Sequence, residues 1–297
     1  MPGEKARNDL PLLFGLLAIN VFWGGSFIAN AIALKSIGPI EIASLRFFIT
    51  APLLFAITLL WKGPGIFKID RKDLLPLIGM AITGVTLQYV IQVSAQSYTS
   101  AINASLLINT STFFILFLGA LFLAEKLTPA RVMGAFIGFG GVALLVSGGK
   151  LDFSLGQAGD IMILVCAFLW ALYTIIGKKL AGRYHPLTVL NYVFILGTIG
   201  FIPFYMLTPH ADVTTIPLPV IGAILFLAVC CSIIAYLVYN VALDSMDVSR
   251  VALFIYFVPM STIILAWLIL GESLTLASGI GGLLVLAGMW IAERKQK

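Results

Sequence analysis

Glutamine recurs every four residues along one apolar stretch of the chain, at Gln88, Gln92 and Gln96, and Tyr89 lies beside this stripe. The spacing places the three amides on one face of a helix. Amide groups bind polar ligands through hydrogen bonds, and they are costly to bury without a partner. The stripe therefore predicts a polar cavity, and the alternative is a set of hydrogen bonds that joins neighbouring helices.

Two more apolar stretches carry polar side chains at helical spacing, and the same two interpretations apply to both. The first stretch contains Ser105, Asn109 and Thr112, and the second contains Ser232, Tyr236 and Asn240, with Tyr239 next to them.

Tryptophan occurs in the middle of two apolar stretches, although membrane tryptophans usually lie at the two interfaces. Trp23 shares a helical face with Asn20, and Trp170 shares one with Tyr173. Such residues either line an internal space or fill volume between helices. We predict that Trp23, Tyr89, Gln92, Trp170 and Tyr239 border a central cavity, whose aromatic, amide and hydroxyl groups would suit an amino acid or an amphipathic metabolite.

Arg46 is the charged side chain that lies well inside an apolar stretch. Its guanidinium group would bind a substrate carboxylate as a bidentate fork. The alternative is structural, because a long arginine stem also reaches the membrane interface or caps helix carbonyls. Both interpretations stay open.

The parts of an enzyme site are missing from the apolar stretches. A hydrolase or transferase would need a nucleophile with a base, or metal ligands, at that depth, whereas His185 and His210 lie in or beside loops. Cys166, Cys230 and Cys231 fall inside apolar stretches, where a thiol packs as a small hydrophobe. We therefore predict no enzymatic activity, no cofactor and no bound metal.

Composition predicts a membrane protein, since 60% of the 297 residues are hydrophobic and 10% are charged. A helix needs roughly 20 apolar residues to cross a bilayer. The chain divides into ten such helices, and the predicted fold is an all-α membrane protein. The expected helices cover 10–32, 39–61, 74–97, 101–123, 129–147, 158–177, 186–207, 217–242, 249–270 and 274–292.

The basic residues predict the orientation. Fifteen of the 18 Lys and Arg residues fall in alternate loops and at the two termini, while Lys35 and Lys150 lie on the other side. The positive-inside rule then predicts that both termini are cytoplasmic. We expect a multi-pass protein of the inner (plasma) membrane. Because the net charge of +5 belongs to these short loops, we predict no nucleic-acid partner.

An internal repeat appears when the chain is shifted by 147 residues. The shift aligns Trp23 with Trp170, Pro39 with Pro186 and Tyr89 with Tyr236, and it also aligns Glu125 with Glu272. Each half holds five helices, an odd number, so the second half would enter the membrane from the opposite side. We predict two inverted five-helix repeats, residues 1–149 and 150–297, which is an architecture of many secondary transporters.

Several short strings resemble the EamA family of the drug/metabolite transporter superfamily, whose members have ten helices in two inverted halves. They are FWGGSF (22–27), ASLRFF (43–48), SYTSAINASLL (97–107), LFLAEKLT (121–128) and LILGESLT (268–275). The resemblance covers nearly the whole chain and implies export or exchange of amino acids, related metabolites or drugs.

The residues and the resemblance together predict a secondary transporter that moves small polar metabolites, above all amino acids, by alternating access. Other metabolites or drugs are the alternative substrates, and a pore or a membrane enzyme is the alternative function. The expected partners are a small-molecule substrate and the lipid bilayer, with the chain as a monomer or a homodimer. Because no acid or His lies deep in the ten helices, we predict exchange or facilitated diffusion without proton coupling.

Overall fold

The computed structural model describes residues 10–99, 101–147, 158–211, 216–270 and 276–293. This part of the chain is helical and contains no β-strand. In chain order its elements are α1 (Leu10–Ala33), α2 (Pro39–Lys62), η1 (Pro64–Phe67), η2 (Arg71–Asp73), α3 (Leu74–Ala81), η3 (Ile82–Thr86), α4 (Leu87–Ala95), α5 (Ala101–Ile108), α6 (Ser111–Leu123), α7 (Pro129–Ser147), α8 (Ala158–Leu180), α9 (Pro186–Met206), α10 (Leu218–Phe226), η5 (Leu227–Ile234), α11 (Ala235–Ser245), α12 (Val248–Leu253), η6 (Phe254–Tyr256), α13 (Phe257–Leu270) and α14 (Leu276–Glu293).

Proline and glycine mark several helix ends. Helices α2 and α9 begin at Pro39 and Pro186. Proline lacks an N–H group, and this costs nothing in the first turn because the N–H groups there have no acceptor within the helix. Gly63 follows α2 and Gly182 lies just after α8, and both have φ of 73°, a conformation that favours glycine. The helices therefore stop where the sequence supplies a residue that can turn the chain.

Helix length and hydropathy agree with a multi-pass membrane protein. Seven helical stretches in the described chain are long and apolar enough to cross a bilayer. Three further apolar helices are shorter, namely Ser111–Leu123, Pro129–Leu144 and Gly279–Ala292. A turn at Asn109 and Thr110 separates α5 from α6, which explains why the expected helix over 101–123 is not continuous.

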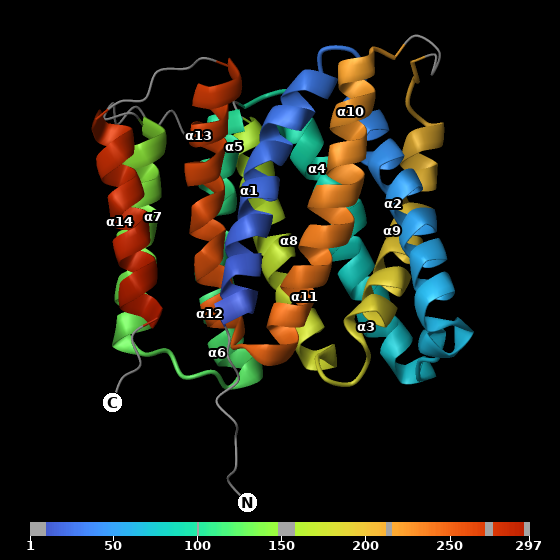
Figure 1. The fold of residues 1–297 in the computed structure, drawn as a ribbon, viewed down its shortest axis with the longest axis horizontal. Coiled ribbons are helices and arrows are strands. Elements are labelled where there is room, and N and C mark those ends of the chain that lie inside the picture. The colour runs from blue at the N-terminus through green and yellow to red at the C-terminus, as the bar shows by residue number, and fades with distance from the viewer. Residues whose placement is uncertain (1–9, 100, 148–157, 212–215, 271–275, 294–297) are drawn as a thin grey trace, which may run out of the picture.

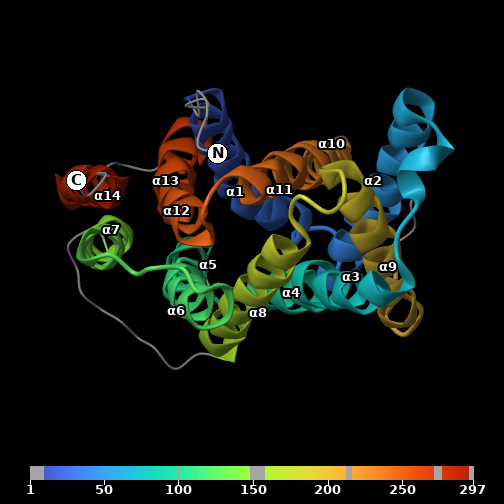
Figure 2. The ribbon, with the colours of Figure 1, turned by 90° about the horizontal axis from the view of Figure 1, so that it is seen from below.

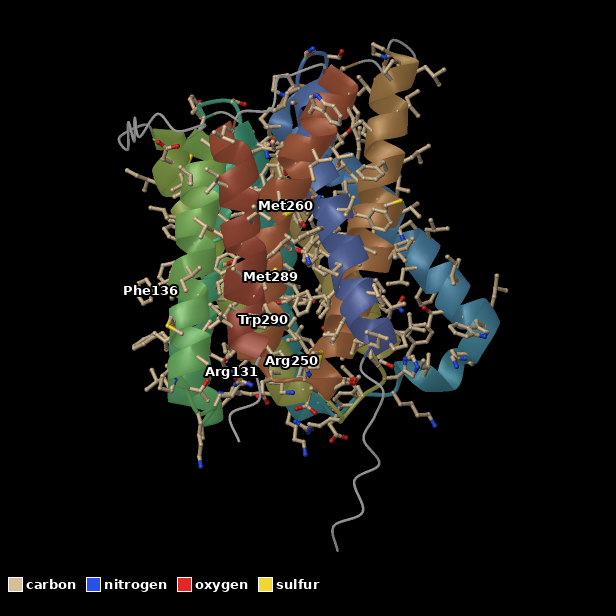
Figure 3. The ribbon with its side chains drawn as sticks, turned by 60° about the vertical axis from the view of Figure 1, so that its left-hand side comes forward. Arg131, Phe136, Arg250, Met260, Met289 and Trp290 are labelled. Atoms are coloured by element: carbon tan, nitrogen blue, oxygen red, sulfur yellow. The ribbon has the colours of Figure 1, made fainter. Side chains whose placement is uncertain are left out.

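The helices form an elongated bundle (Figures 1 and 2). Helices α7 and α14 lie together at one end of its long axis, and α2 and α9 lie together at the other. The first described helix begins at the lower end of Figure 1 and α14 finishes at the same end. Arg131, labelled in Figure 3, lies at this lower end, and so does the segment from the last turn of α8 to the start of α9, which contains Lys178 and Arg183. We call this lower end the basic end.

Small residues hold the α7–α14 pair together. A methyl group on Gly134 would lie 2.5 Å from the carbonyl oxygen of Gly288, so only glycine allows this approach. Phe136 and Trp290, labelled in Figure 3, expose 65% and 60% of their surfaces. Met289 on the same α14 helix is buried. The pair thus has a packed side and an apolar outer surface suited to lipid.

The helix boundaries repeat with the 147-residue shift. The stretch from α5 to α6 covers Ala101–Leu123, and the stretch from α12 to α13 covers Val248–Leu270, the same residues shifted by 147. Helices α2 and α9 are equivalent under this shift and lie antiparallel. Thr188, at the start of α9, donates a hydrogen bond to the Ile66 carbonyl beyond the end of α2 (2.8 Å). Glu41, near the start of α2, accepts one from the Ala211 amide beyond the end of α9 (3.2 Å).

Candidate functional site

Five aromatic rings meet where α1, α8 and α11 come together, and we call them the aromatic cluster. The Trp23 and Trp170 rings make an edge contact with centroids 5.4 Å apart. Trp170 stacks on Tyr173 at 5.0 Å, and it also contacts Tyr236 and Tyr239 at 5.5 and 5.1 Å. The two mid-helix tryptophans of the sequence therefore contact each other at the centre of the bundle.

A cavity lies beside the aromatic cluster. The space open to the centre of a water molecule is about 60 Å³. One water needs only about 10–15 Å³ on this measure, so the cavity has room for a few waters and is too small for a metabolite. Its walls are Trp23, Ser26, Phe27, Gln88, Tyr89, Gln92, Ile108, Ser111, Trp170, Ile255 and Val258.

The polar groups of the cavity are only partly satisfied. Gln88 Nε2 donates to Gln92 Oε1 at 3.1 Å. Gln88 Oε1 and the Ser111 hydroxyl are buried, and within the described chain they have no hydrogen-bond partner. Buried polar atoms normally find partners, so these two atoms suit a bound water or an N–H group of a ligand.

Two π-helical segments frame the aromatic cluster. They are η3 and η5, whose residues are related by the 147-residue shift. The wider turn of a π-helix disturbs the regular hydrogen-bond ladder, and such segments often occur at functional sites. Tyr236 donates its hydroxyl to the Gly84 carbonyl of η3 at 2.6 Å, and Trp23 Nε1 donates to the Cys231 carbonyl of η5 at 3.1 Å.

Arg46 lies next to this centre but does not line the cavity. Its Nε donates to Ser232 Oγ at 2.7 Å, and its NH2 group donates to the Tyr89 hydroxyl at 3.2 Å. The Tyr89 and Tyr236 hydroxyls are 3.1 Å apart. Each phenol carries one proton, and Tyr236 gives its proton to Gly84. A chain of hydrogen bonds thus runs from Arg46 through Tyr89 and Tyr236 to the π-helix backbone.

The remaining predicted residues lie outside the cavity wall. Asn240 donates to the Tyr173 hydroxyl at 2.7 Å and so supports the aromatic cluster. Asn20 donates to the Leu16 carbonyl and Asn109 to the Ser105 carbonyl, each four residues earlier. Gln96 lies at the opposite end of the bundle from the basic end, in a groove described below.

Six lining residues were not predicted as site residues: Ser26, Phe27, Ile108, Ser111, Ile255 and Val258. The internal repeat could have indicated four of them, because the 147-residue shift aligns Ile108 with Ile255 and Ser111 with Val258. Equivalent residues also meet elsewhere at the centre, as Phe47 contacts Phe194 with ring centroids 5.6 Å apart.

The two ends of the bundle differ. At the basic end, Arg183 pairs with Asp73 at 2.7 Å and the Tyr184 hydroxyl donates to the same carboxylate. This hydrogen bond raises the pKa of Tyr184 above its ordinary value, because a phenolate beside a carboxylate is unfavourable. The opposite end carries a groove of about 740 Å³ on the measure used above, lined in part by Ser36, Ile37 and Gln96.

Metal binding finds no support in the described chain, where no group of three or more His, Cys, Asp or Glu side chains is placed to hold an ion.

Comparisons with known proteins match this chain over nearly its whole length. The EamA-like transporter family matches residues 10–147 and again residues 157–293. An uncharacterized transporter of Archaeoglobus fulgidus is 39% identical over 95% of this chain and 97% of its own length. A probable amino-acid metabolite efflux pump of Escherichia coli is 26% identical over 93% of this chain and 92% of its own. The chain also superposes on a solved crystal structure with a TM-score of 0.78. The match covers 95% of each of the two chains, whose sequences are 20% identical.

Proposed function

We propose that this chain, which belongs to the EamA-like transporter family, carries small polar metabolites, above all amino acids, across the inner membrane by alternating access. The observation that carries the proposal is the central cavity, where Trp23 and Trp170 meet beside unpartnered polar atoms of Gln88 and Ser111. Aromatic faces and hydrogen-bond acceptors together suit a small molecule that carries N–H groups.

The proposed architecture has ten spans in two inverted repeats, residues 1–149 and 150–297. It is supported by the two separate matches to the family, by the shifted helix boundaries and by the antiparallel course of α2 and α9. Two halves of one plan in opposite orientations can exchange two shapes around a fixed central site. The small cavity fits a conformation between the two open shapes.

We propose that the basic end faces the cytoplasm and that both termini lie there. Arg131, Lys178 and Arg183 belong to the loops and helix ends that the positive-inside rule assigns to the cytoplasm, and they support this orientation. A cysteine at Thr214, in the loop expected on the other side, should react with an impermeant maleimide in intact cells. Labelling of this cysteine only after the membrane is broken would contradict the proposed orientation.

Amino acids are the proposed substrates because the cavity offers acceptors for an ammonium group, and because a relative at 26% identity is named a probable amino-acid metabolite efflux pump. We propose that the protein exports these substrates or exchanges them across the membrane. Other small metabolites with the same pattern of donors are the alternative class.

The decisive experiment is counterflow in proteoliposomes with a panel of labelled amino acids, sugars and nucleotides. Saturable exchange of amino acids supports the proposal, and exchange of another class moves the assignment to that class. Flux that does not saturate supports a pore. Trp23→Ala should reduce exchange at least 10-fold, whereas Trp61→Ala, at an exposed tryptophan on α2, should not.

Coupling to protons is not part of the proposal. Glu41 and Asp160 are buried in the first turns of α2 and α8, at the opposite end from the basic end, where they bond to the Ala211 amide and to Thr99. Neither lines the central cavity. A pH gradient imposed across proteoliposomes without a substrate gradient should leave the substrate at equilibrium, and uphill accumulation that an uncoupler abolishes would contradict this.

A further inference from the structure

Arg46 is a buried charge whose contacts are neutral groups. Only 1% of its surface is exposed. Its hydrogen bonds go to Ser232 and Tyr89, and the Tyr89 ring lies 4.1 Å from its Cζ atom. Within the described chain no carboxylate comes within ion-pair distance of its guanidinium group. The positive charge is therefore solvated by hydroxyls and π-electrons and is not neutralised.

This arrangement is expensive for a purely structural residue. Removing a cation from water costs several kcal/mol unless an opposite charge compensates. The fold itself does not require a charge there, because the equivalent position in the second half is Val193. The extra charge of the first half thus calls for a partner that the protein alone does not supply.

Tyr89 stands between Arg46 and the cavity. Its side chain lines the cavity wall, and its hydroxyl accepts a hydrogen bond from the Arg46 NH2 group. A hydroxyl at this place satisfies one guanidinium donor, but a carboxylate would satisfy two and would neutralise the charge. Tyr89 therefore separates the Arg46 guanidinium group from the cavity.

We propose that Arg46 is the receptor for the substrate's carboxylate, and that the Tyr89 hydroxyl occupies its place until the substrate arrives. The inference rests on the proposed function and names the chemistry of its site. The carboxylate binds the guanidinium group, while Gln88 Oε1 and the Ser111 hydroxyl accept N–H groups from the ammonium end. The site therefore selects zwitterions over their uncharged or purely cationic analogues.

The test compares the amino acid that gives the strongest counterflow with its carboxamide, which keeps the ammonium group and loses the negative charge. Dissociation constants of both are measured by calorimetry on purified wild-type protein, Arg46→Gln, Arg46→Lys and Tyr89→Phe. Arg183→Gln, which removes a guanidinium group at the basic end, is the matched control. Where no amino acid exchanges, the same acid and amide pairs are titrated directly.

The wild type should prefer the acid over the amide about 10- to 100-fold, the range of one or two charged hydrogen bonds. Arg46→Gln should weaken binding of the acid by that factor and leave the amide unchanged, with Arg46→Lys between them. Tyr89→Phe should bind the acid a few-fold more tightly, because the competing hydroxyl is gone. Arg183→Gln should keep the wild-type preference.

Two outcomes would overturn the assignment of Arg46 and are distinct from failure of the proposed function. If Arg46→Gln weakens acid and amide equally, or keeps the preference, Arg46 is structural while exchange of amino acids stands. If the wild type exchanges an amino acid but binds its amide equally well, no carboxylate receptor exists. A wild type that neither exchanges nor binds any amino acid or carboxylate rejects both proposals.

Discussion

The two segments that the EamA-like transporter family matches, residues 10–147 and 157–293, have corresponding helix boundaries and differ in the side chains that they bring to the centre. Equivalent aromatic residues meet there, namely Trp23 with Trp170, Phe47 with Phe194 and Tyr89 with Tyr236. At neighbouring positions the first half has Arg46, Gln88 and Gln92, where the second half has Val193, Ala235 and Tyr239. Arg46 and the two amides of the cavity wall thus come from one half, and a ligand between the halves would meet two different walls.

The same comparison applies to the ends of the bundle. Asp73, Arg183 and Tyr184 tie the basic end together. Under the 147-residue shift their equivalents at the opposite end are Val220, Ser36 and Ile37, which cannot form ion pairs. Two of these equivalents line the groove at that end. The equivalent positions at the two ends therefore carry different side chains, and of these two sets only the one at the basic end forms an ion pair.

The largest expected loss of stability comes from adding a side chain at Gly84 in η3, where the equivalent residue of η5 already has one. The equivalent of Gly84 is Cys231, which carries a side chain. A methyl group on Gly84 would lie 2.1 Å from the Tyr173 ring, so Gly84→Ala must displace that ring from the aromatic cluster. We expect a loss of about 3 kcal/mol of unfolding free energy, measured by thermal and denaturant unfolding in detergent. Cys231→Ala is the control, and equal stability of both variants would show that the segments tolerate the same side chains.

The next effect should come from Asp73→Asn at the basic end. The Asp73 side chain is 4% exposed and serves both Arg183 and Tyr184. Its loss should cost about 2 kcal/mol because the buried Asp73 carboxylate accepts charge-assisted hydrogen bonds from the Arg183 guanidinium group and the Tyr184 hydroxyl. Asp70→Asn is the control, since the Asp70 pair with Lys72 is exposed and contributes at most about 1 kcal/mol. The variant should also react faster with maleimides directed to the basic end, and unchanged labelling would deny Asp73 a role in closing it.

Tyr236→Phe and Tyr89→Phe should separate the two equivalent tyrosines. The Tyr236 hydroxyl donates to the buried Gly84 carbonyl, so its removal leaves that acceptor without its side-chain partner and should cost about 1–2 kcal/mol. The Tyr89 hydroxyl accepts a hydrogen bond from the buried Arg46 guanidinium group, so its removal leaves a charged donor without that acceptor and should cost more, about 2 kcal/mol or above. Melting temperatures of the two variants measure the difference, and a smaller loss for Tyr89→Phe would show that Arg46 does not depend on the Tyr89 hydroxyl.

The smallest effect is a dependence on alkaline pH. Hydrogen bonding to Asp73 raises the pKa of Tyr184 in the folded protein above the unfolded value near 10. The stabilisation is therefore complete below about pH 10 and is lost as the pH rises through the folded pKa. Labelling of the basic end should increase over that range in the wild type and remain level in Tyr184→Phe. Identical profiles for both proteins would remove Tyr184 from the closure of this end.

The sequence predicted the helical fold and four of the five residues expected around the cavity, whereas Tyr239 lies in the aromatic cluster outside the cavity wall. Long uncharged stretches leave few options but helices in a bilayer, and polar or aromatic side chains at mid-helix must face the interior, as Trp23, Gln92 and Trp170 do. The π-helical segments could not be predicted, because they shift the face of α4 and α11 without a distinct residue pattern. Local backbone acceptors also explain why Asn20 and Asn109 lie outside the cavity wall, since each amide bonds to the carbonyl four residues earlier.

The central claim is that the two ends open alternately around one site, and paired spin labels at equivalent positions test it most directly. Labels at Lys72 and Leu121 report on the basic end, and labels at their 147-residue equivalents, Pro219 and Leu268, report on the opposite end. All four side chains are exposed. We expect the substrate identified by counterflow to shift the two distance distributions in opposite directions in liposomes. Distances that lengthen together, or that ignore a substrate the protein exchanges, would contradict alternating access.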